Sequence, residues 1–281
     1  MTGHVWLVLA SGFLFGAVGQ GAAEKDYGRF EGIWRFDLVE VEGAKRPPVP
    51  FETNKIIIGK DGNFIVVHAP KITRGVFKLD PSKSPRHFDF IVSSGSAKGQ
   101  TITGIYEISD DTYKLCLPLP EKARPADFVS KPGSGTILQI LKRERQDVKE
   151  ALTKVGRQEL TGSWQAVSYA LDGNKASDED MKHIKLVFDA AGNGVASREG
   201  KVFVEASSKL DLSKNPPAID FHYTTGDYKG QTSLGIYEVE DDVLTICRAP
   251  NGKARPTKFE STPGSGLTLM GYKRDKVVAD K

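Results

Sequence analysis

One long stretch of the chain occurs twice, and this repeat constrains the fold more than any other feature. Residues 98–143 contain, in order, K-G-Q-T, G-I-Y-E, two aspartates, a cysteine, A-R-P, P-G-S-G and K-R, and residues 229–274 repeat that pattern 131 positions later. Upstream, a Gly-x-Trp motif also occurs twice. A duplicated unit of roughly 115 residues is long enough for each copy to form a domain. The sequence therefore predicts two tandem domains of the same fold.

Short runs of β-branched and aromatic residues, bounded by turn residues, recur through each copy. Their short, even spacing predicts that each copy forms an antiparallel sandwich or barrel of about eight strands. Between the copies, Val148, Leu152 and Val155 fall on one face of a charged segment, which predicts an amphipathic helix. We expect a first domain at 24–143, a helical linker at 144–159, a second domain at 160–274 and a frayed tail at 275–281.

The first 23 residues contain no Lys, Arg, Asp or Glu. The apolar run from Val5 to Val18 is followed by small residues up to Ala23. This pattern is typical of a secretory signal peptide, although its usual positive start is missing. The alternative, an uncleaved anchor, would need about 20 apolar residues. We therefore expect a signal peptide at 1–23 and export to the periplasm, cell envelope or extracellular space, without a membrane span in the mature chain.

Charge is nearly balanced along the chain, with 39 basic and 36 acidic residues and a formal net charge of +3. Nucleic-acid-binding proteins usually carry a one-signed field or a basic stripe, and neither is present in the sequence. The hydrophobic fraction of 39% is ordinary for a globular protein. A domain of this size can bury a core without metal or disulfide. We expect a monomer that does not bind nucleic acid.

The two cysteines, Cys116 and Cys247, occupy equivalent positions in the two copies. They could form a disulfide only if the two domains brought their Cα atoms within about 7 Å of each other. Each cysteine lies inside a predicted strand, where a small apolar side chain packs well. We favour two unpaired structural cysteines over a bridge between the domains.

Each copy begins with Gly-x-Trp and ends with Lys-Arg. If the first and last strands are neighbours, the arginine can lie on the tryptophan face, a contact worth about 0.5–2 kcal/mol. Closing the sheet in this way would remove its exposed edges. Six residues are assigned this structural role: Gly32, Trp34 and Arg143 in the first copy, and Gly162, Trp164 and Arg274 in the second.

Gly-x-Trp on the first strand with a terminal arginine over it resembles the lipocalin superfamily, whose eight-stranded up-and-down barrels hold small apolar ligands. The motifs Leu-x-Gly-x-Trp, Leu-Asp-x-Ser-Lys-x-Pro, Gly-Ile-Tyr-Glu, Asp-x-Leu-x-x-Cys and Arg-Pro-x-x-Phe are similar to an uncharacterised exported lipocalin-like domain family abundant in planctomycetes. The first copy departs from these motifs at Phe30 and Tyr113. The resemblance covers nearly the whole chain after the leader. It implies an all-β fold of two tandem eight-stranded antiparallel lipocalin-like barrels joined by a short helical linker, and it carries no function.

Signals for catalysis and for metal or cofactor binding are weak. The histidines do not repeat between the copies and show no metal-binding spacing. Neither a nucleophile elbow nor a phosphate-binding loop is present in the sequence. The repeated acids could act as a carboxylate pair, but the Asp pairs read better as hairpin turns. We expect no metal and no cofactor, and we rank enzymatic activity low.

The repeated Arg-Pro motif leaves two interpretations open. Arg124 and Arg255 could bind an anionic head group at a barrel mouth. Alternatively, each pairs with an acid of the neighbouring hairpin while Phe128 or Phe259 plugs the barrel end, and we favour this structural interpretation. For each of the repeated tyrosines two roles also stay open: an anchor in the core, or a hydroxyl that faces a pocket. The tentative ligand-binding residues are Arg124, Arg255, Tyr106 and Tyr237.

Two functional hypotheses from different classes follow. The leading one is an exported non-catalytic binding module for a small apolar or amphiphilic ligand. The alternative is a structural or protein-interaction module of the cell envelope with filled barrels. An apolar cavity of several hundred cubic ångströms would favour the first. A packed interior with an exposed apolar patch would favour the second.

Overall fold

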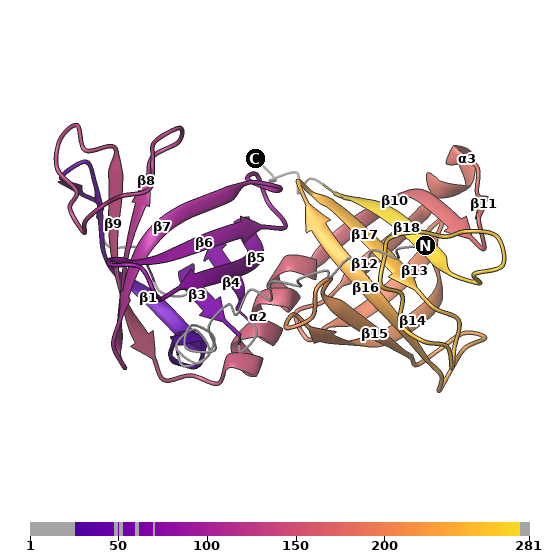
Figure 1. The fold of residues 1–281 in the computed structure, drawn as a ribbon. Coiled ribbons are helices and arrows are strands. Elements are labelled where there is room, and N and C mark those ends of the chain that lie inside the picture. Colours follow the sequence, from indigo (N-terminus) through magenta and orange to yellow (C-terminus); the bar gives the residue numbers. More distant parts are fainter. Residues whose placement is uncertain (1–25, 48–49, 51–52, 60–61, 70, 276–281) are drawn as a thin grey trace, which may run out of the picture.

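The chain forms two closed antiparallel β-barrels with a helix between them (Figure 1). The structure is a computed structural model, and it describes residues 26–47, 50, 53–59, 62–69 and 71–275. Eight antiparallel strands close each barrel. The predicted all-β fold of two tandem eight-stranded barrels with a helical linker is therefore confirmed. The predicted signal peptide at 1–23 lies outside the described residues, as does the predicted tail from residue 276 onwards.

In the first barrel each strand pairs with its neighbours in the sequence, and the last strand returns to the first. The strands are β1 (Gly32–Val41), β3 (Asn54–Ile58), β4 (Asn63–His68), β5 (Lys71–Asp80), β6 (Arg86–Val92), β7 (Thr101–Ile108), β8 (Thr112–Pro118) and β9 (Thr136–Glu144). A two-residue strand, β2 (Ala44–Lys45), extends the hairpin that begins with β1. Closure places Trp34 opposite Arg143 in the β1–β9 ladder.

The second barrel repeats this order of strands. They are β10 (Gly162–Leu171), β12 (Ile184–Phe188), β13 (Asn193–Arg198), β14 (Lys201–Asp211), β15 (Ala218–Tyr223), β16 (Thr232–Glu240), β17 (Val243–Arg248) and β18 (Thr268–Arg274). The short β11 (Asn174–Lys175) pairs with β10, and a single-turn helix, α3 (Asp178–Met181), follows it. Trp164 lies opposite Arg274 where β10 closes on β18.

Each barrel is closed at one end by the Gly-x-Trp motif and the terminal arginine. In the first copy, the Arg143 guanidinium carbon lies 4.2 Å from the centroid of the Trp34 ring. Arg143 also donates to the carbonyls of Arg29 and Glu31, at 2.5 and 2.6 Å. A Cβ atom at Gly32, where φ is +142°, would lie 2.5 Å from Arg143 Nη1. Glycine is therefore needed for the guanidinium to reach the ring.

The second copy closes in the same way. Arg274 lies 4.0 Å from the centroid of the Trp164 ring and donates to the carbonyls of Glu159 and Thr161. Each indole also donates backwards: Trp34 Nε1 to Phe30 O at 2.8 Å, and Trp164 Nε1 to Leu160 O at 2.7 Å. A helical segment before the first strand is thus fixed to each barrel end.

Aromatic rings fill the interior of the first barrel. Their contacts are mostly edge-on or tilted, at centroid distances from 4.5 to 6.2 Å. The buried aromatic residues of this core are Phe30, Trp34, Phe64, Phe77, Phe88, Phe90, Tyr106 and Tyr113. Such rings bury large apolar areas and pack well in these geometries.

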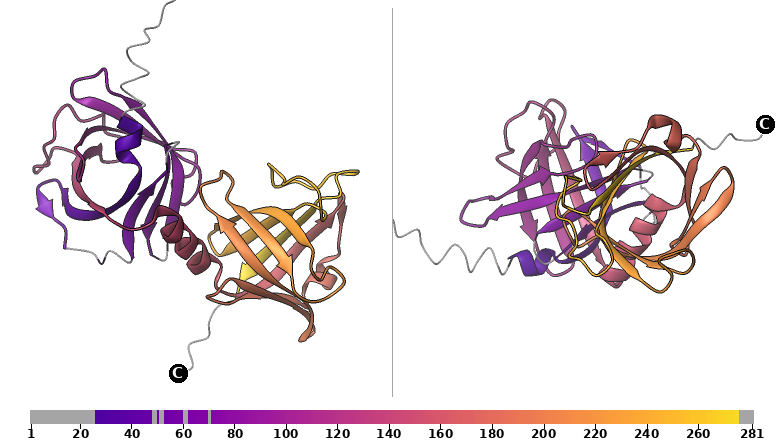
Figure 2. Two further views of the ribbon diagram at one scale, coloured as in Figure 1. Left: turned by 90° about the horizontal axis from the view of Figure 1, so that it is seen from below. Right: turned by 90° about the vertical axis from the view of Figure 1, so that its right-hand side faces the viewer.

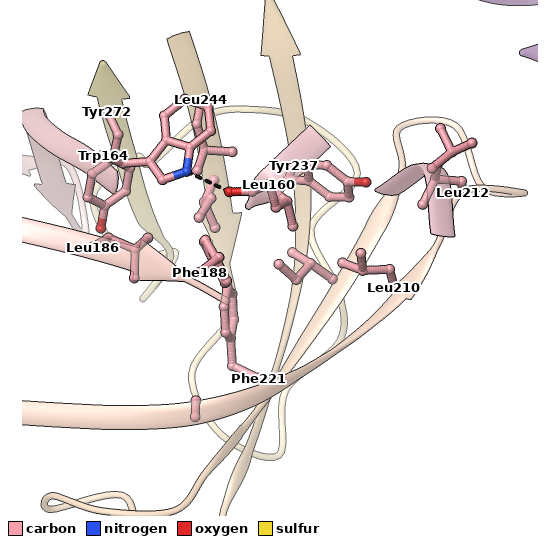
Figure 3. Packing of buried hydrophobic residues seen from close by; sticks show 14 of the residues in the cluster. Leu160, Trp164, Leu186, Phe188, Leu210, Leu212, Phe221, Tyr237, Leu244 and Tyr272 are labelled. Carbon is pink, nitrogen blue, oxygen red and sulfur yellow. Dashed lines mark hydrogen bonds between the residues drawn. The ribbon is translucent and has the colours of Figure 1, made fainter. Parts of the chain in front are cut away.

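The second barrel is filled at one end only. Figure 3 shows Trp164, Leu160, Tyr237, Leu244 and Phe188 packed together at the end that adjoins the helix between the barrels. Towards the α3 end, smaller side chains line the wall, among them Gly194, Ala196 and Ala206. The two copies share a backbone plan and differ in how their interiors are filled.

The linker helix α2 (Val148–Leu160) packs against both barrels (Figure 2). It begins at Asp147, whose side chain accepts a hydrogen bond from Glu150 N at 2.7 Å, a typical N-cap. Its buried side chains belong to a single hydrophobic core. That core also contains outward-facing residues of the first barrel and the residues at the closed end of the second barrel. The first-barrel residues in this core are Ile33, Ile57, Ile65 and Val67.

A buried ion pair crosses from the first barrel to α2. Arg74, on β5, donates to both carboxylate oxygens of Glu159, at 2.9 and 2.6 Å. Burial alone would lower the pKa of Arg74, but the adjacent Glu159 carboxylate raises it above its ordinary value. Lys98 also reaches the second barrel, 3.0 Å from Glu240. It also lies 3.8 Å from Glu238. The barrels are joined by apolar packing, by the buried pair of Arg74 with Glu159, and by the more exposed contact of Lys98 with these two acids.

Candidate functional site

A cavity of about 510 Å³ lies in the second barrel, at the end covered by α3. Small-molecule sites in proteins commonly measure ~300–1,000 Å³. Most of the lining side chains are apolar or aromatic, as is usual for such sites. They include Ile184, Leu186, Ala196, Phe203, Phe221, Tyr223, Ile246, Met270 and Tyr272.

Part of the cavity wall has a glycine where the first copy has a ring. Phe64 lies opposite Ile58 in the first barrel, and Gly194 lies opposite the equivalent Phe188 in the second. Gly194 therefore occupies the position of Phe64, which is 3% exposed and part of the aromatic core.

Two further ring positions differ in the same direction. Phe77 pairs with Phe90, whereas its structural equivalent Ser208 pairs with Phe221. On the first strand of each barrel, Phe36 is replaced by Ala166 two residues after the shared tryptophan. Of these three positions, Gly194 lines the cavity, whereas Ser208 and Ala166 do not. The second copy also gains two rings, with Phe188 in place of Ile58 and Tyr272 in place of Leu141. The two interiors therefore differ in where their rings lie, and the glycine leaves part of the cavity wall without a side chain.

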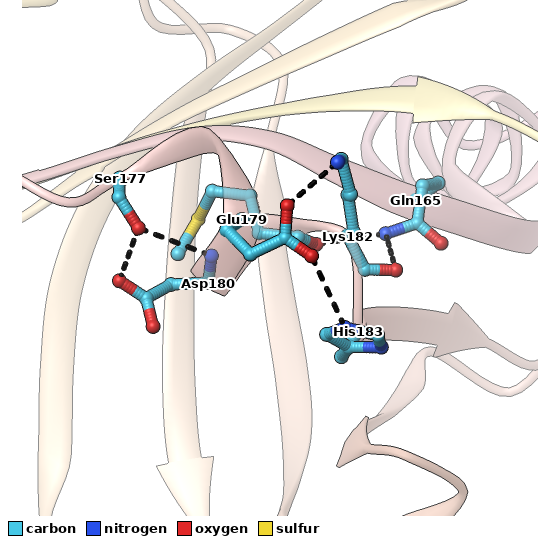
Figure 4. A network of polar contacts seen from close by, with 7 residues as sticks. Gln165, Ser177, Glu179, Asp180, Lys182 and His183 are labelled. Atoms are coloured by element: carbon cyan, nitrogen blue, oxygen red, sulfur yellow. Dashed lines mark hydrogen bonds and ion pairs between the residues drawn. The ribbon is translucent and has the colours of Figure 1, made fainter.

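The short helix α3 forms one side of the cavity mouth. Ser177 caps it, accepting a hydrogen bond from Asp180 N at 3.3 Å and donating to the Asp180 carboxylate at 2.6 Å. Gln165 Nε2 donates to the carbonyl of Lys182 at 3.1 Å (Figure 4). It also donates to the carbonyls of Met181 and Ile184, both at 2.9 Å. These bonds hold Met181 buried against the cavity.

Polar groups are few and lie mainly at the mouth. Arg248, the last residue of β17, donates from Nη1 to Tyr223 Oη at 2.9 Å. Deeper, Tyr272 donates to Met270 Sδ at 3.3 Å, and burial raises the pKa of Tyr272 to about 12. Tyr272 is therefore a neutral phenol at physiological pH. The cavity can hold an apolar body while presenting a cation where it opens.

Arg124 and Arg255 lie in equivalent settings, and neither lines this cavity. Arg124 donates to the carbonyls of Phe88 and Gly104, at 2.7 and 2.6 Å, and pairs with Asp89 at 2.6 Å. Arg255 contacts the carbonyls of Ile219 and Gly235 and pairs with Asp220 at 2.6 Å. Each arginine thus spans two neighbouring strands and a carboxylate, the arrangement expected of the structural interpretation.

Arg124→Gln should lower the free energy of unfolding by about 1–3 kcal/mol, because charge-assisted hydrogen bonds to backbone and carboxylate are lost. Asp89 is 38% exposed, so the remaining charge stays hydrated and costs less than a stranded buried one. Denaturant unfolding measures the loss, with the exposed Lys122→Gln as a charge-matched control. Normal stability with weaker binding of a fatty-acid probe would instead favour the head-group interpretation.

The two tentative tyrosines occupy the closed ends of their barrels. Tyr106 Oη donates to Asp26 at 2.8 Å, and burial together with this bond raises the pKa of Tyr106 above its ordinary value. Tyr237 lies beside α2, and burial and the Glu159 carboxylate hold its pKa well above the usual range. Neither residue lines the cavity under α3.

The remaining structural candidates lie on the outward face of the penultimate strands. Cys116 and Cys247 are buried and unpaired, each with its thiol directed at a carbonyl of the loop that covers it. Phe128 is half-buried, with Lys114 Nζ 4.6 Å from its ring centroid. Phe259 is also half-buried. The structure thus places Phe128 against the outside of β8, where we had expected a buried plug at the barrel end, because the loop carrying it folds back over the strand.

The cavity residues are the ones that sequence reasoning missed. Our candidates were residues shared by both copies, and shared residues maintain the common fold. The cavity lies where the copies differ, at positions such as Gly194 and Arg248. A large-to-small comparison of the copies would have pointed to it. In the described part of the chain, no group of three or more His, Cys, Asp or Glu residues is placed to hold a metal ion.

Solved structures similar to the chain include two from bacteria. One is a protein of unknown function from the DUF3598 family of Nostoc punctiforme, at 10% identity and a TM-score of 0.26, with 90% of this chain and 99% of that chain covered. The other is a double mutant of the vaccine antigen transferrin-binding protein B from Haemophilus parasuis, at 11% identity and a TM-score of 0.23, covering 85% of this chain. The chain spans 45% of that second protein. No protein-family model and no curated protein matches the sequence.

Among the described residues, no helix is both long and apolar enough to cross a membrane.

Proposed function

We propose that this chain is a non-catalytic binding module that holds a small apolar or amphiphilic ligand in its second barrel. The observation that carries this proposal is the cavity of about 510 Å³ beneath α3, lined mostly by apolar and aromatic side chains. A preformed cavity of this kind binds an apolar body with little cost in reorganisation. Export of the protein rests on the leader pattern at 1–23 and stays a prediction.

The first barrel supports a different role within the same chain. Its interior is occupied by eight buried aromatic residues, so it fits the filled barrel of the structural alternative. We propose that it serves as a scaffold whose outer face anchors α2 and hence the closed end of the second barrel. The duplication would then have separated stability from binding.

Ala196→Phe should weaken binding of a neutral apolar probe such as N-phenyl-1-naphthylamine, because a phenyl ring on β13 would occupy part of the cavity. We expect a loss in affinity of about tenfold or more, the equivalent of ~1.4 kcal/mol. Fluorescence titration measures it. Val187→Phe adds the same ring on the neighbouring strand β12, at an outward position 42% exposed, and should bind normally. Probe binding that is absent from the wild type, or that survives Ala196→Phe unchanged, would contradict the proposal.

A further inference from the structure

The cavity mouth carries a cation that the protein leaves without a counter-ion. Arg248 is half-buried, and among the described residues its guanidinium donates one hydrogen bond, to the neutral Tyr223 hydroxyl, and lies 6.0 Å from the centroid of that ring. Within the described part of the chain, no Asp or Glu forms an ion pair with Arg248. Three other half-buried arginines each pair with an acid: Arg124 with Asp89, Arg255 with Asp220, and Arg274 with Asp242. Arg143 has no acid partner among the described residues, but three backbone carbonyls hold its guanidinium.

The arginine also lies at a defined level of the barrel. Arg248 pairs with Thr268, the first residue of β18, whereas Arg274, the last residue of β18, covers Trp164 at the closed end. Arg248 therefore lies at the end away from α2. Ile246, two residues before Arg248 and on the same face of β17, lines the cavity deeper in the barrel. The deep part of the cavity wall is therefore apolar, and the mouth carries a positive charge.

Comparison of the copies shows that this feature belongs to the hollow barrel. Arg248 stands where the first copy has Leu117, and Tyr223 stands where it has Val92. Leu117 packs against the aromatic core. The second copy therefore differs from the first both in the cavity wall, at Gly194, and in an arginine–tyrosine pair at the mouth.

Two other charged groups line the mouth, and both are exposed. Arg198, at the end of β13, adds a second cation. Asp180 is the one lining carboxylate among the described residues, and it accepts a hydrogen bond from Ser177 Oγ at 2.6 Å. Exposed charges are screened by water and salt far more than half-buried ones. The half-buried Arg248 should therefore dominate recognition of a head group.

Resting on the binding function proposed above, we infer that the ligand is an acidic amphiphile: its tail lies in the barrel and its carboxylate or phosphate head is bound by Arg248, which Tyr223 orients. A guanidinium presents donors in a planar fork that matches either anion. The tail would pack among Leu186, Phe221 and Met270, which line the interior. Without the ligand, Arg248 keeps its charge hydrated at the mouth.

The test compares dodecanoate, dodecyl phosphate, dodecanol and dodecylamine by calorimetric titration of the full chain. The wild type should bind at least one of the two anions about tenfold to a hundredfold more tightly than dodecanol, the range for hydrogen bonds to a charged group. The stronger of the two anions identifies the head. Arg248→Leu, which installs the first copy's residue, should remove this preference and leave dodecanol affinity within about threefold.

Two controls keep the outcome interpretable. Arg198→Leu removes the same charge from the exposed side of the mouth and should retain most of the preference. Arg248→Gln provides a second variant should the leucine destabilise the barrel. The inference is overturned by equal binding of anions and dodecanol in the wild type, by a preference for dodecylamine, or by an anion preference that survives both Arg248 variants. Binding of dodecanol without any anion preference would leave the proposed function intact, whereas failure of all four probes would overturn both.

Discussion

Trp34→Ala destabilises the first barrel by about 3–5 kcal/mol, the cost expected for truncating a large core aromatic. Trp34 is fully buried, contacts the Tyr113 ring at a centroid distance of 5.7 Å and supports Arg143 on its face. Its removal leaves a cavity, deletes the bond from Nε1 to Phe30 O and exposes the guanidinium that closes β1 on β9. Hydrogen exchange of the β3–β9 amides measures this loss separately from the second barrel.

Trp164→Ala provides the matched experiment in the second barrel, where Trp164 is equally buried and covered by Arg274. Trp34→Phe and Trp164→Phe retain a ring and lose the indole donor, so each should cost less than the alanine variant. A loss below about 1 kcal/mol for either alanine variant would show that the Gly-x-Trp motif does not hold its barrel closed.

The closed ends of the barrels could be predicted from the sequence because their constraint is local and repeated. Gly32, Trp34 and Arg143 recur with the same residue types in the second copy, and the physics of a cation over an indole requires neighbouring first and last strands. The strand pattern and the turn residues then fix an antiparallel meander. Agreement between two copies acts as a strong filter for residues that the fold itself needs.

The cavity could not be predicted by the same filter. Volume inside a barrel depends on which rings meet across it, and facing residues such as Phe188 and Phe221 come from strands far apart in the sequence. Gly194 and Ser208 look like ordinary strand interruptions until the register shows which rings they replace. Arg248 looks like an exposed strand end until the structure shows that no acid in the described ranges pairs with it. A comparison that considers only the residues shared by both copies misses a site formed by residues that differ between them.

The contact between the barrels was also beyond sequence reasoning, because its partners differ between the copies. The position of Arg74 is occupied by Glu205 in the second copy, and the position of Glu159 by Arg29 in the first. Neither residue repeats, and they are 85 positions apart in the sequence. Only the packing of α2 against β5 shows that they form a pair.

The pair formed by Arg74 and Glu159 gives the second large effect. Their side chains are 10% and 6% exposed and make a two-point contact. Removing one partner leaves the other charge buried without compensation, so Arg74→Met and Glu159→Leu should each cost about 3–5 kcal/mol. The double variant replaces both charges with apolar groups of similar volume and should recover most of that loss. Denaturant unfolding of the four proteins completes the cycle and gives the coupling free energy.

The size of the coupling free energy shows whether the ion pair keeps the two barrels packed together. A coupling of about 2 kcal/mol or more means that the two charges stay desolvated together, so the barrels remain packed through α2 while the chain is folded. Single variants that each lose less than about 1 kcal/mol, with an additive double variant, mean that water reaches the pair and that the barrels separate easily. Val148→Ala, on the partly buried face of α2, is the control without a change in charge. It weakens the same contact between helix and barrel but leaves no charge buried without a partner. We expect strong coupling, because Glu159 also lies against the Tyr237 phenol at the closed end of the second barrel, where an unpaired carboxylate would have little access to water.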